Sequence, residues 1–231
     1  MTTETIPIQS SVMMPKKNNN SPADLIRPEA SLSDLWKAAQ ECHGCDIWER
    51  ATQAVLGEGA PGAEVMMVGE QPGLREDIEG HPFVGPAGKL LDRALEEAGI
   101  ERSKVYITNV VKHFNSIQRG KLRIHKKPSA REIAACRPWL DAEIARVRPK
   151  VIVCLGATAA QALISRAFRV STQRGQLMGS ALVPLIGATV HPSSILRAPN
   201  EESRHREMRQ FVDDLKKIAQ HLPSSVLPRK T

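Results

Sequence analysis

Two polar segments carry residue types that could do chemistry together, and each directly follows an apolar run. Glu70 lies in residues 69–73 (GEQPG) after the apolar residues 65–68, and His191 opens residues 191–197 (HPSSILR) after the run GATV. Both patterns are typical of a buried strand that ends in a loop, which is where open α/β sheets present their ligand sites. We therefore expect a carboxylate and an imidazole to face one pocket.

Four cysteines form a second candidate site. Cys42 and Cys45 have C-x-x-C spacing, and Cys136 and Cys154 follow with 17 residues between them. In an intracellular chain this set favours a metal site over disulfides, because reducing compartments keep thiols free. Four thiolates suit tetrahedral zinc or a [4Fe–4S] cluster, and the lack of a second tight pair favours iron–sulfur. The alternative is that Cys154 is a small core residue and Cys136 lies on a helix face.

The glycine-rich residues 85–89 (GPAGK) do not form a phosphate-binding loop. The pattern G-x-x-x-x-G-K-[ST] requires Gly where Phe83 stands and Ser or Thr where Leu90 stands. No G-x-G-x-x-G follows a strand either. Nucleotide hydrolysis and dinucleotide redox chemistry are therefore disfavoured.

The charge balance favours a polyanionic partner. The 231 residues include 32 Lys and Arg against 25 Asp and Glu, which gives a formal net charge of +7. Charge alone does not distinguish DNA from RNA or a membrane surface. Aromatic residues make up only 3% of the chain, which argues against a broad stacking platform for single-stranded nucleic acid. Any base contact must use one or two rings.

The composition predicts one domain with tails. Hydrophobic residues make up 41% of the chain, enough to fill a core of this size. We expect a disordered tail at residues 1–30, a folded domain over residues 31–221 and a frayed tail at residues 222–231. We find no secretory signal and no run of ~18 apolar residues, the length that spans a membrane. A cytoplasmic, monomeric protein without a membrane segment is expected.

The elements that must position these residues alternate between helices and strands, which indicates an α/β fold with parallel strands. Ser129 and Glu132 have the spacing of a capping box, and Pro138 should break or kink the helix that follows. The other expected helices span residues 31–39, 86–98 and 201–220, and the expected strands include residues 105–111 and 151–155.

The ordered motifs together resemble the uracil-DNA glycosylase superfamily. The similarity rests on residues 69–73, 80–88 (GHPFVGPAG), 108–110 (TNV) and 191–197 and on the cysteine spacing. They resemble the iron–sulfur branch, which includes the family 4 enzymes, over about residues 35–217. The resemblance implies a single-domain three-layer sandwich with a central four-stranded parallel sheet and a uracil pocket at the strand ends. It also implies a [4Fe–4S] cluster held by Cys42, Cys45, Cys136 and Cys154.

Uracil excision requires residues of these types. The flipped base must be read along its edge and gripped on its face. Phe83 can stack on the base, and the Asn109 amide matches uracil N3–H and O4, where cytosine presents the wrong pattern. Glu70 would stabilise the positive charge on the sugar, and His191 would donate to uracil O2. Taken singly, Glu70 is better interpreted as a surface turn carboxylate and His191 as a helix-cap histidine. The predicted uracil-binding residues are Gly69, Gln71, Phe83, Asn109 and His191.

We expect DNA contacts from the second polar segment and from a basic loop. Ile195 or Leu196 would fill the gap left by the flipped base, and ordinary packing of Leu196 is the alternative. The partner is uracil-containing DNA, with single strands accepted. The predicted DNA-binding residues are Lys121, Arg123, Ser193, Ser194, Leu196 and Arg197.

The basic loop covers residues 116–128 (SIQRGKLRIHKKP) and should lie above the same pocket. It resembles the extra loop of the UdgX type, whose K-R-R-I-H ends in a histidine that becomes attached to the DNA sugar. Leu122 stands where that type has Arg, and Gln71 matches it where family 4 enzymes commonly have Ala. The resemblance implies that His125 is a catalytic residue that captures the sugar cation in place of water.

Two alternatives remain for this chain. One is a family 4 glycosylase that turns over with water, in which His125 only positions DNA. The other is a non-catalytic iron–sulfur module that senses redox state on nucleic acid.

Overall fold

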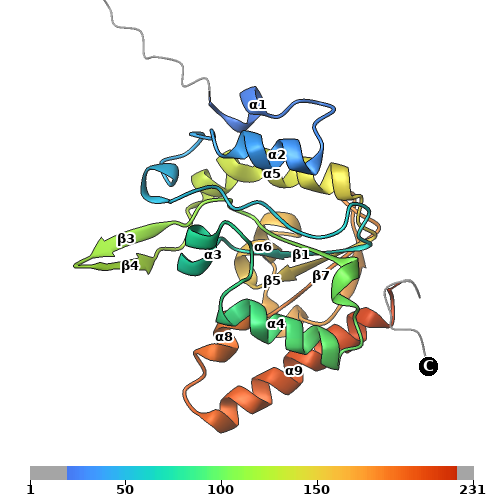
Figure 1. The fold of residues 1–231 in the computed structure, drawn as a ribbon. Coiled ribbons are helices and arrows are strands. Elements are labelled where there is room, and N and C mark those ends of the chain that lie inside the picture. Colours follow the sequence, from blue (N-terminus) through green and yellow to red (C-terminus); the bar gives the residue numbers. More distant parts are fainter. Residues whose placement is uncertain (1–19, 223–231) are drawn as a thin grey trace, which may run out of the picture.

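The computed structural model describes residues 20–222, which form a three-layer α/β sandwich around a central sheet (Figure 1). The sheet has five strands in the order β2-β1-β5-β7-β6. A separate hairpin consists of β3 and β4. The strands are β1 (Val65–Gly69), β2 (Val105–Asn109), β3 (Ser116–Arg119), β4 (Leu122–His125), β5 (Val151–Leu155), β6 (Leu177–Gly179) and β7 (Leu185–Thr189).

Four of the five strands are parallel, as predicted. Val65 of β1 pairs with Val105 of β2 and with Val151 of β5, and β5 pairs in parallel with β7. Their carboxyl ends therefore share one edge of the sheet. The four predicted parallel strands are present, and β6 adds a fifth, antiparallel strand at the edge next to β7.

Helices cover both faces of the sheet (Figure 1). The α1, α2, α5 and α6 helices pack on one face, and α4, α8 and α9 pack on the other. The helices are α1 (Pro22–Leu25), α2 (Leu32–Ala39), α3 (Leu74–Glu79), α4 (Pro86–Glu97), α5 (Ala130–Val147), α6 (Ala157–Leu163), α7 (Val170–Gln173), α8 (Pro192–Leu196) and α9 (Glu201–Ala219), with 3-10 turns η1 (Trp48–Arg50) and η2 (Arg102–Lys104).

The sheet separates two hydrophobic cores. Along β1, Met66 and Val68 point into the core beneath α2 and α5, whereas Val65 and Met67 point into the core beneath α4 and α9. This alternation follows from the two-residue period of a strand. Both faces are buried, which explains why the parallel strands read as continuous apolar runs.

Helix boundaries follow the predicted caps. The Ser129 hydroxyl accepts the backbone N–H of Glu132, and the Glu132 carboxylate accepts the backbone N–H of Ser129 at 2.6 Å. Pro138 was predicted to break or kink this helix, and it does not break it: α5 continues through the proline to Val147. Trp139, directly after the proline, is buried in the core and holds the helix against the sheet.

Residues 20–30 fall within the predicted tail, but they are ordered. The α1 helix packs on α5, and the Arg146 guanidinium on α5 donates to the backbone carbonyls of Pro28 and Ala30. These contacts replace the water that a free tail would bind. Residues 1–19 and 223–231, which complete the predicted tails, lie outside the described residues. Within residues 20–222, no helix combines the length and the apolar character that crossing a membrane requires.

The predicted basic loop contains a two-stranded hairpin, β3–β4. Its strands pair antiparallel, with Ile117 opposite Ile124, and Gly120 in the turn has a φ of 60°. Apolar and polar residues alternate at 116–118 and at 122–125, a pattern typical of strands that is hard to see in so basic a segment. The hairpin projects from the sandwich beside α3 (Figure 1).

Candidate active site

A cavity of about 520 Å³ opens at the carboxyl edge of the sheet. Its walls come from the ends of β1, β2 and β5, from the hairpin and from the start of α8. The two polar segments singled out in the sequence therefore meet in one cavity. The predicted residues that line it are Glu70, Gln71, Phe83, Asn109, His125, His191, Ser193 and Arg197.

One wall of the cavity presents an unpaired polar atom. Asn109 is 2% exposed, and its Oδ1 has no hydrogen-bond partner among the described residues. A methyl group at Gly69 would lie 2.4 Å from this oxygen and 2.8 Å from Phe83 Cζ. The glycine thus keeps the Asn109 oxygen and the Phe83 ring free of an intervening side chain. An unpaired buried acceptor of this kind is suited to a ligand N–H.

The Phe83 loop is held in an unusual backbone conformation. Phe83 has a φ of 56°, and its ring centroid lies 5.8 Å from that of His191. A methyl group at Gly88 would lie 1.5 Å from the Phe83 carbonyl oxygen. The glycine-rich residues 85–89 therefore allow α4 to approach the Phe83 loop closely.

Both oxygens of the Glu70 carboxylate have protein partners. The Thr158 hydroxyl donates to Oε2, and His125 Nε2 lies 3.2 Å from Oε1. Burial raises the pKa of Glu70, but the hydrogen bonds from His125 and Thr158 and the electrostatic effect of His125 and Lys127 outweigh it. The net pKa lies below its ordinary value. The site thus contains a fixed anion near neutral pH.

His191 is a neutral hydrogen-bond donor in this arrangement. Its Nδ1 accepts the backbone N–H of Ser193 at 3.1 Å, so the single ring proton of the neutral form lies on Nε2. Burial, together with Arg197 and His125, lowers the pKa of His191 to about 4 and outweighs the opposite effect of Glu70. At neutral pH the imidazole can therefore donate one hydrogen bond, from Nε2–H.

Two anchors hold the hairpin that carries His125. The Gln71 amide donates to the carbonyls of Asn115 and Lys126 at 3.1 and 3.3 Å, one on each side of the hairpin. The Arg123 guanidinium binds the buried Asp77 carboxylate of α3 at 2.7 Å. Gln71 lines the cavity, but its amide group is committed to the hairpin backbone.

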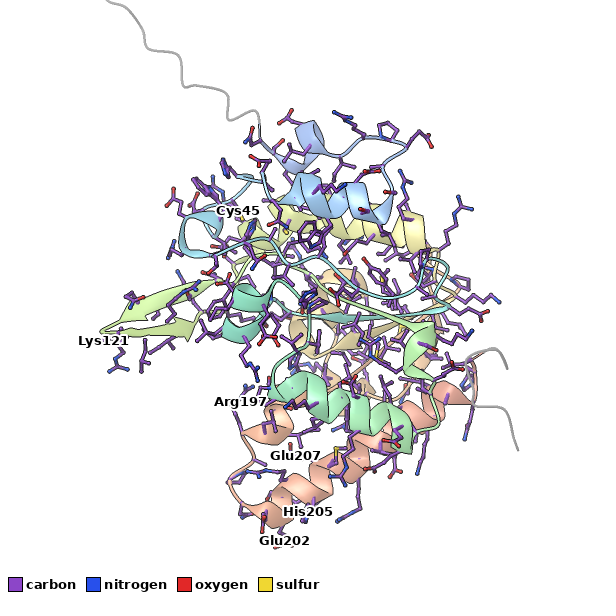
Figure 2. The ribbon with its side chains drawn as sticks, viewed as in Figure 1. Cys45, Lys121, Arg197, Glu202, His205 and Glu207 are labelled. Atoms are coloured by element: carbon purple, nitrogen blue, oxygen red, sulfur yellow. The ribbon has the colours of Figure 1, made fainter. Side chains whose placement is uncertain are left out.

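The remaining predicted DNA-binding residues lie outside the cavity wall. Arg123 is bound to Asp77 and is not free to bind a phosphate. Ser194 Oγ donates to the His191 carbonyl at 2.8 Å, and Leu196 is half-buried at the end of α8. Figure 2 shows Lys121 at the hairpin tip and Arg197 beside α8, on the same side of the molecule.

Thr158 is a site residue that the sequence analysis missed. It follows Gly156 just beyond the end of β5 and lines the cavity beside Glu70. The signal was present, because residues 151–155 form an apolar strand that ends in Gly. The strand-end rule that singled out Glu70 and His191 applies equally to this third strand.

The four cysteines lie on the α5 side of the sheet. Cys42, Cys136 and Cys154 are buried in that core, and the half-buried Cys45 packs against it. Within residues 20–222, no three Cys, His, Asp or Glu side chains gather into a group that could hold a metal ion.

Hydrogen bonds to two of the sulfurs fit a thiolate-bound cluster. The Trp139 indole N–H donates to Cys42 Sγ and the Lys112 backbone N–H donates to Cys136 Sγ, both at 3.2 Å. N–H donors of this kind tune the sulfurs of iron–sulfur sites. The type and placement of the donors thus fit such a cluster, although the side chains form no closed ligand shell.

Comparisons with known proteins agree with this geometry. Residues 56–216 match the model of the uracil DNA glycosylase superfamily. Three similar relatives are called type-4 uracil-DNA glycosylase. The protein from Sulfurisphaera tokodaii is 38% identical, over 81% of this chain and 83% of its own length. Those from Archaeoglobus fulgidus and Thermotoga maritima are 35% and 38% identical, each over 82% of this chain and over 92% and 93% of their own lengths. The chain therefore belongs to the uracil-DNA glycosylase superfamily.

Proposed function

We propose that this protein excises uracil from DNA by breaking the bond between base and sugar. The observation that carries the proposal is the Oδ1 atom of Asn109, which has no hydrogen-bond partner among the described residues. Gly69 has no side chain that would cover this oxygen. Uracil N3–H can donate to this oxygen while the amide N–H group donates to O4. Membership of the superfamily, and relatives named for uracil-DNA glycosylase activity, support the same reaction.

The charges of the site suit bond breakage. Uracil N1 keeps the electron pair of the bond to C1′, so that the base becomes an anion and the sugar a cation. His191 Nε2–H would stabilise the anion at O2, and the Glu70 carboxylate would stabilise the cation. Phe83 would hold the face of the flipped base. These three groups and Asn109 line one cavity before substrate binds, which limits reorganisation during the reaction.

The main route for the sugar cation is attack by water. The relatives named type-4 enzymes support this assignment. Water attack at C1′ gives an abasic sugar, and the proton that the water loses neutralises the uracil anion. This route returns the protein to its starting state, so the enzyme turns over.

Capture by His125 is the second candidate, and one contact favours it. His125 Nε2 lies 3.2 Å from Glu70 Oε1, the carboxylate proposed to face C1′. For capture, a neutral His125 would pass its Nε2 proton to Glu70 and form a bond from Nε2 to C1′. The bond from C1′ to uracil N1 breaks, and uracil leaves with its electrons. The protein would then complete a single turnover.

A denaturing gel distinguishes the two routes. The protein is incubated with single-stranded DNA that contains one uracil, and with the same DNA that contains thymine. Free abasic product over many turnovers supports water attack. A shifted band that survives heating with SDS and is lost in His125→Ser supports capture. No reaction of either kind on the uracil strand would contradict the proposed activity.

The four cysteines are proposed to hold a [4Fe–4S] cluster with a structural role. The support is an all-thiol donor set within one core and the N–H donors on Cys42 and Cys136. Anaerobically purified protein should absorb near 400 nm and contain iron and sulfide in equal amounts. Zinc in their place, or Cys136→Ala with unchanged absorbance and metal content, would contradict the proposal.

Arg197 and Ser193 are proposed to bind phosphates next to the flipped nucleotide. Both line the cavity, and the Arg197 side chain is exposed. Arg197→Ala should weaken binding to all DNA sequences and reduce the slope of log affinity against log salt by about 1. Fluorescence anisotropy in a salt series measures this slope. An unchanged slope would remove Arg197 from the phosphate contacts.

A further inference from the structure

A buried ion pair lies directly behind the wall that carries Asn109. Lys112 follows β2 and Glu143 belongs to α5, and their side chains are 1% and 0% exposed. Lys112 Nζ lies 2.5 Å from Glu143 Oε2. Neither residue lines the cavity, and the proposed reaction uses neither of them.

All bonding positions of the Lys112 ammonium are occupied by protein groups. An ammonium has three protons to donate. Lys112 Nζ donates to Glu143 Oε2, to Thr108 Oγ1 at 2.7 Å and to the Asn109 carbonyl at 2.6 Å. No proton remains for a ligand, so this charge acts on the protein itself.

Glu143 is equally committed. Its Oε1 accepts the backbone N–H of Gly57 at 2.6 Å and the Tyr106 hydroxyl at 3.0 Å, and Thr108 bonds to both oxygens. Tyr106 and Thr108 belong to β2, the strand that ends at Asn109. The ion pair thus joins α5 to the last residues of that strand.

The backbone around Asn109 depends on these bonds. Among residues 20–222, the Asn109 side-chain oxygen has no partner that could orient it, so its position follows from the backbone. Beyond Asn109, the N–H groups of Val110 and Val111 donate to the carbonyls of Gly69 and Glu70 at 2.9 and 3.0 Å. The Asn109 carbonyl itself is held by Lys112.

We propose that the Lys112–Glu143 ion pair is a positioning device that sets where the Asn109 amide meets the uracil edge. The inference rests on the proposed function, because it assigns these residues to base reading rather than to stability alone. A small displacement of a group that reads the substrate can lower the rate strongly. The pair therefore affects excision through Asn109 and leaves contacts to the DNA backbone unchanged.

A double-mutant cycle with Asn109 tests this inference. The variant Lys112→Met/Glu143→Gln removes both charges together, and the new amide keeps an acceptor for Gly57 and Tyr106. It is compared with Asn109→Ala and with the triple variant by single-turnover excision of uracil from DNA. We expect the Lys112→Met/Glu143→Gln replacement to lower the excision rate by about tenfold or more when Asn109 is present. When Asn109 is already replaced by Ala, the same replacement should lower the rate by less than about a further twofold.

Two controls separate positioning from general damage. Affinity for thymine-containing DNA should stay within about twofold, since coupling is expected only between residues in contact. The control is the Arg174–Asp214 ion pair, in which Nε and Oδ2 are 2.5 Å apart. Asp214 accepts a hydrogen bond from the Thr189 hydroxyl of β7, a strand that β1 and β5 separate from β2 in the sheet. Arg174→Met/Asp214→Asn should show no coupling to Asn109→Ala.

The outcomes distinguish this inference from the proposed function. If the rate losses of Lys112→Met/Glu143→Gln and Asn109→Ala simply add while the unmodified protein excises uracil, the positioning role is wrong and the proposed function stands. A wild-type protein that excises no uracil would overturn both. Thermal unfolding followed by circular dichroism checks that the variants fold. If the double replacement does not fold, Glu143→Gln alone enters the same cycle and is judged by the same criterion.

Discussion

At the scale of single residues, the site separates base reading from bond breaking. Asn109 is proposed to read the base, and Gly69 leaves its side-chain oxygen uncovered. Glu70 and His191 carry the charge and the donor proposed for bond cleavage. These groups come from three strand ends. Each can therefore be changed while the others stay in place.

Asn109→Asp should abolish most uracil excision. A carboxylate only accepts hydrogen bonds, so it would face uracil O4 without a proton to offer. Because the new carboxylate and uracil O4 are both acceptors and would face each other without a hydrogen bond, kcat/KM should fall by at least about 100-fold. Steady-state kinetics on a uracil-containing strand measures the loss. Retained activity with unchanged KM would show that Asn109 does not read this edge.

Thr158→Val should make excision more sensitive to acid. The Thr158 hydroxyl donates to the ionised Glu70, so its removal raises the Glu70 pKa, and the carboxylate is neutralised at higher pH. The acid limb of the pH profile of single-turnover rates should therefore move upward. Thr158→Ser keeps the hydroxyl and serves as the matched control. Equal profiles for Val and Ser would exclude this role.

The sequence identified half of the residues that line the cavity, but not the partners of each group. Glu70 and His191 follow recognisable strand ends, and Asn109 lies in a motif (residues 108–110) that resembles the superfamily, which is why these residues could be found. Arg123 was predicted to bind DNA, and its pairing with Asp77 was not foreseen, because a sequence gives the charge of a residue and not the charge it faces. Thr158 carries no charge and did not stand out, although it contacts Glu70.

At the scale of elements, one ion pair joins the hairpin β3–β4 to α3. Asp77 is fully buried, and the Arg123 side chain, 24% exposed, binds it at 2.7 Å. Arg123→Met leaves that carboxylate without its cation. We expect the free energy of unfolding to fall by about 2 kcal/mol, less than for a fully enclosed pair.

Urea unfolding measures this change, and Arg119→Met is the control. Arg119 is exposed near the hairpin turn, so its replacement should change stability by at most about 0.5 kcal/mol. Any adduct through His125 should also form more slowly in Arg123→Met. Equal stabilities of the two variants would argue against the anchoring role.

Element boundaries were predictable where local signals are strong. The capping box at Ser129 and the apolar runs of β1, β2 and β5 identify their elements directly. The β6 strand has three residues, too few to show a period, and it pairs with β7 through Gly187. A methyl group at Gly187 would lie 2.4 Å from the Gln176 carbonyl oxygen, so the two strands pair closely only because residue 187 is a glycine. This contact between distant segments is not visible in the sequence.

At the scale of the whole molecule, stability should fall in mild acid. His113 is 6% exposed, and burial lowers its pKa from 6.5 to about 4, an effect that His43 adds to and Asp77 opposes. The unfolded chain therefore binds a proton near pH 6.5, which the folded protein binds only near pH 4. This difference should remove about 3 kcal/mol of stability as the pH falls through that window.

Urea unfolding at pH 7 and pH 4.5 tests this window. His113→Gln removes the titrating ring, so its stability should depend less on pH than that of the unmodified protein. His191, whose pKa is also lowered to about 4, contributes in the same direction and remains in the variant. An identical loss in both proteins would place the acid sensitivity elsewhere.

The hairpin between β2 and α5 pairs with itself and with no strand of the main sheet in the part of the chain described. The hairpin β3–β4 could therefore become longer or shorter in evolution, or be replaced, without a change in the register of the parallel strands. Recognition of the base and the fate of the sugar would then be inherited separately. If His125 captures the sugar, transplanting residues 113–128 into a relative that lacks them should transfer that capture and leave the choice of base as it was.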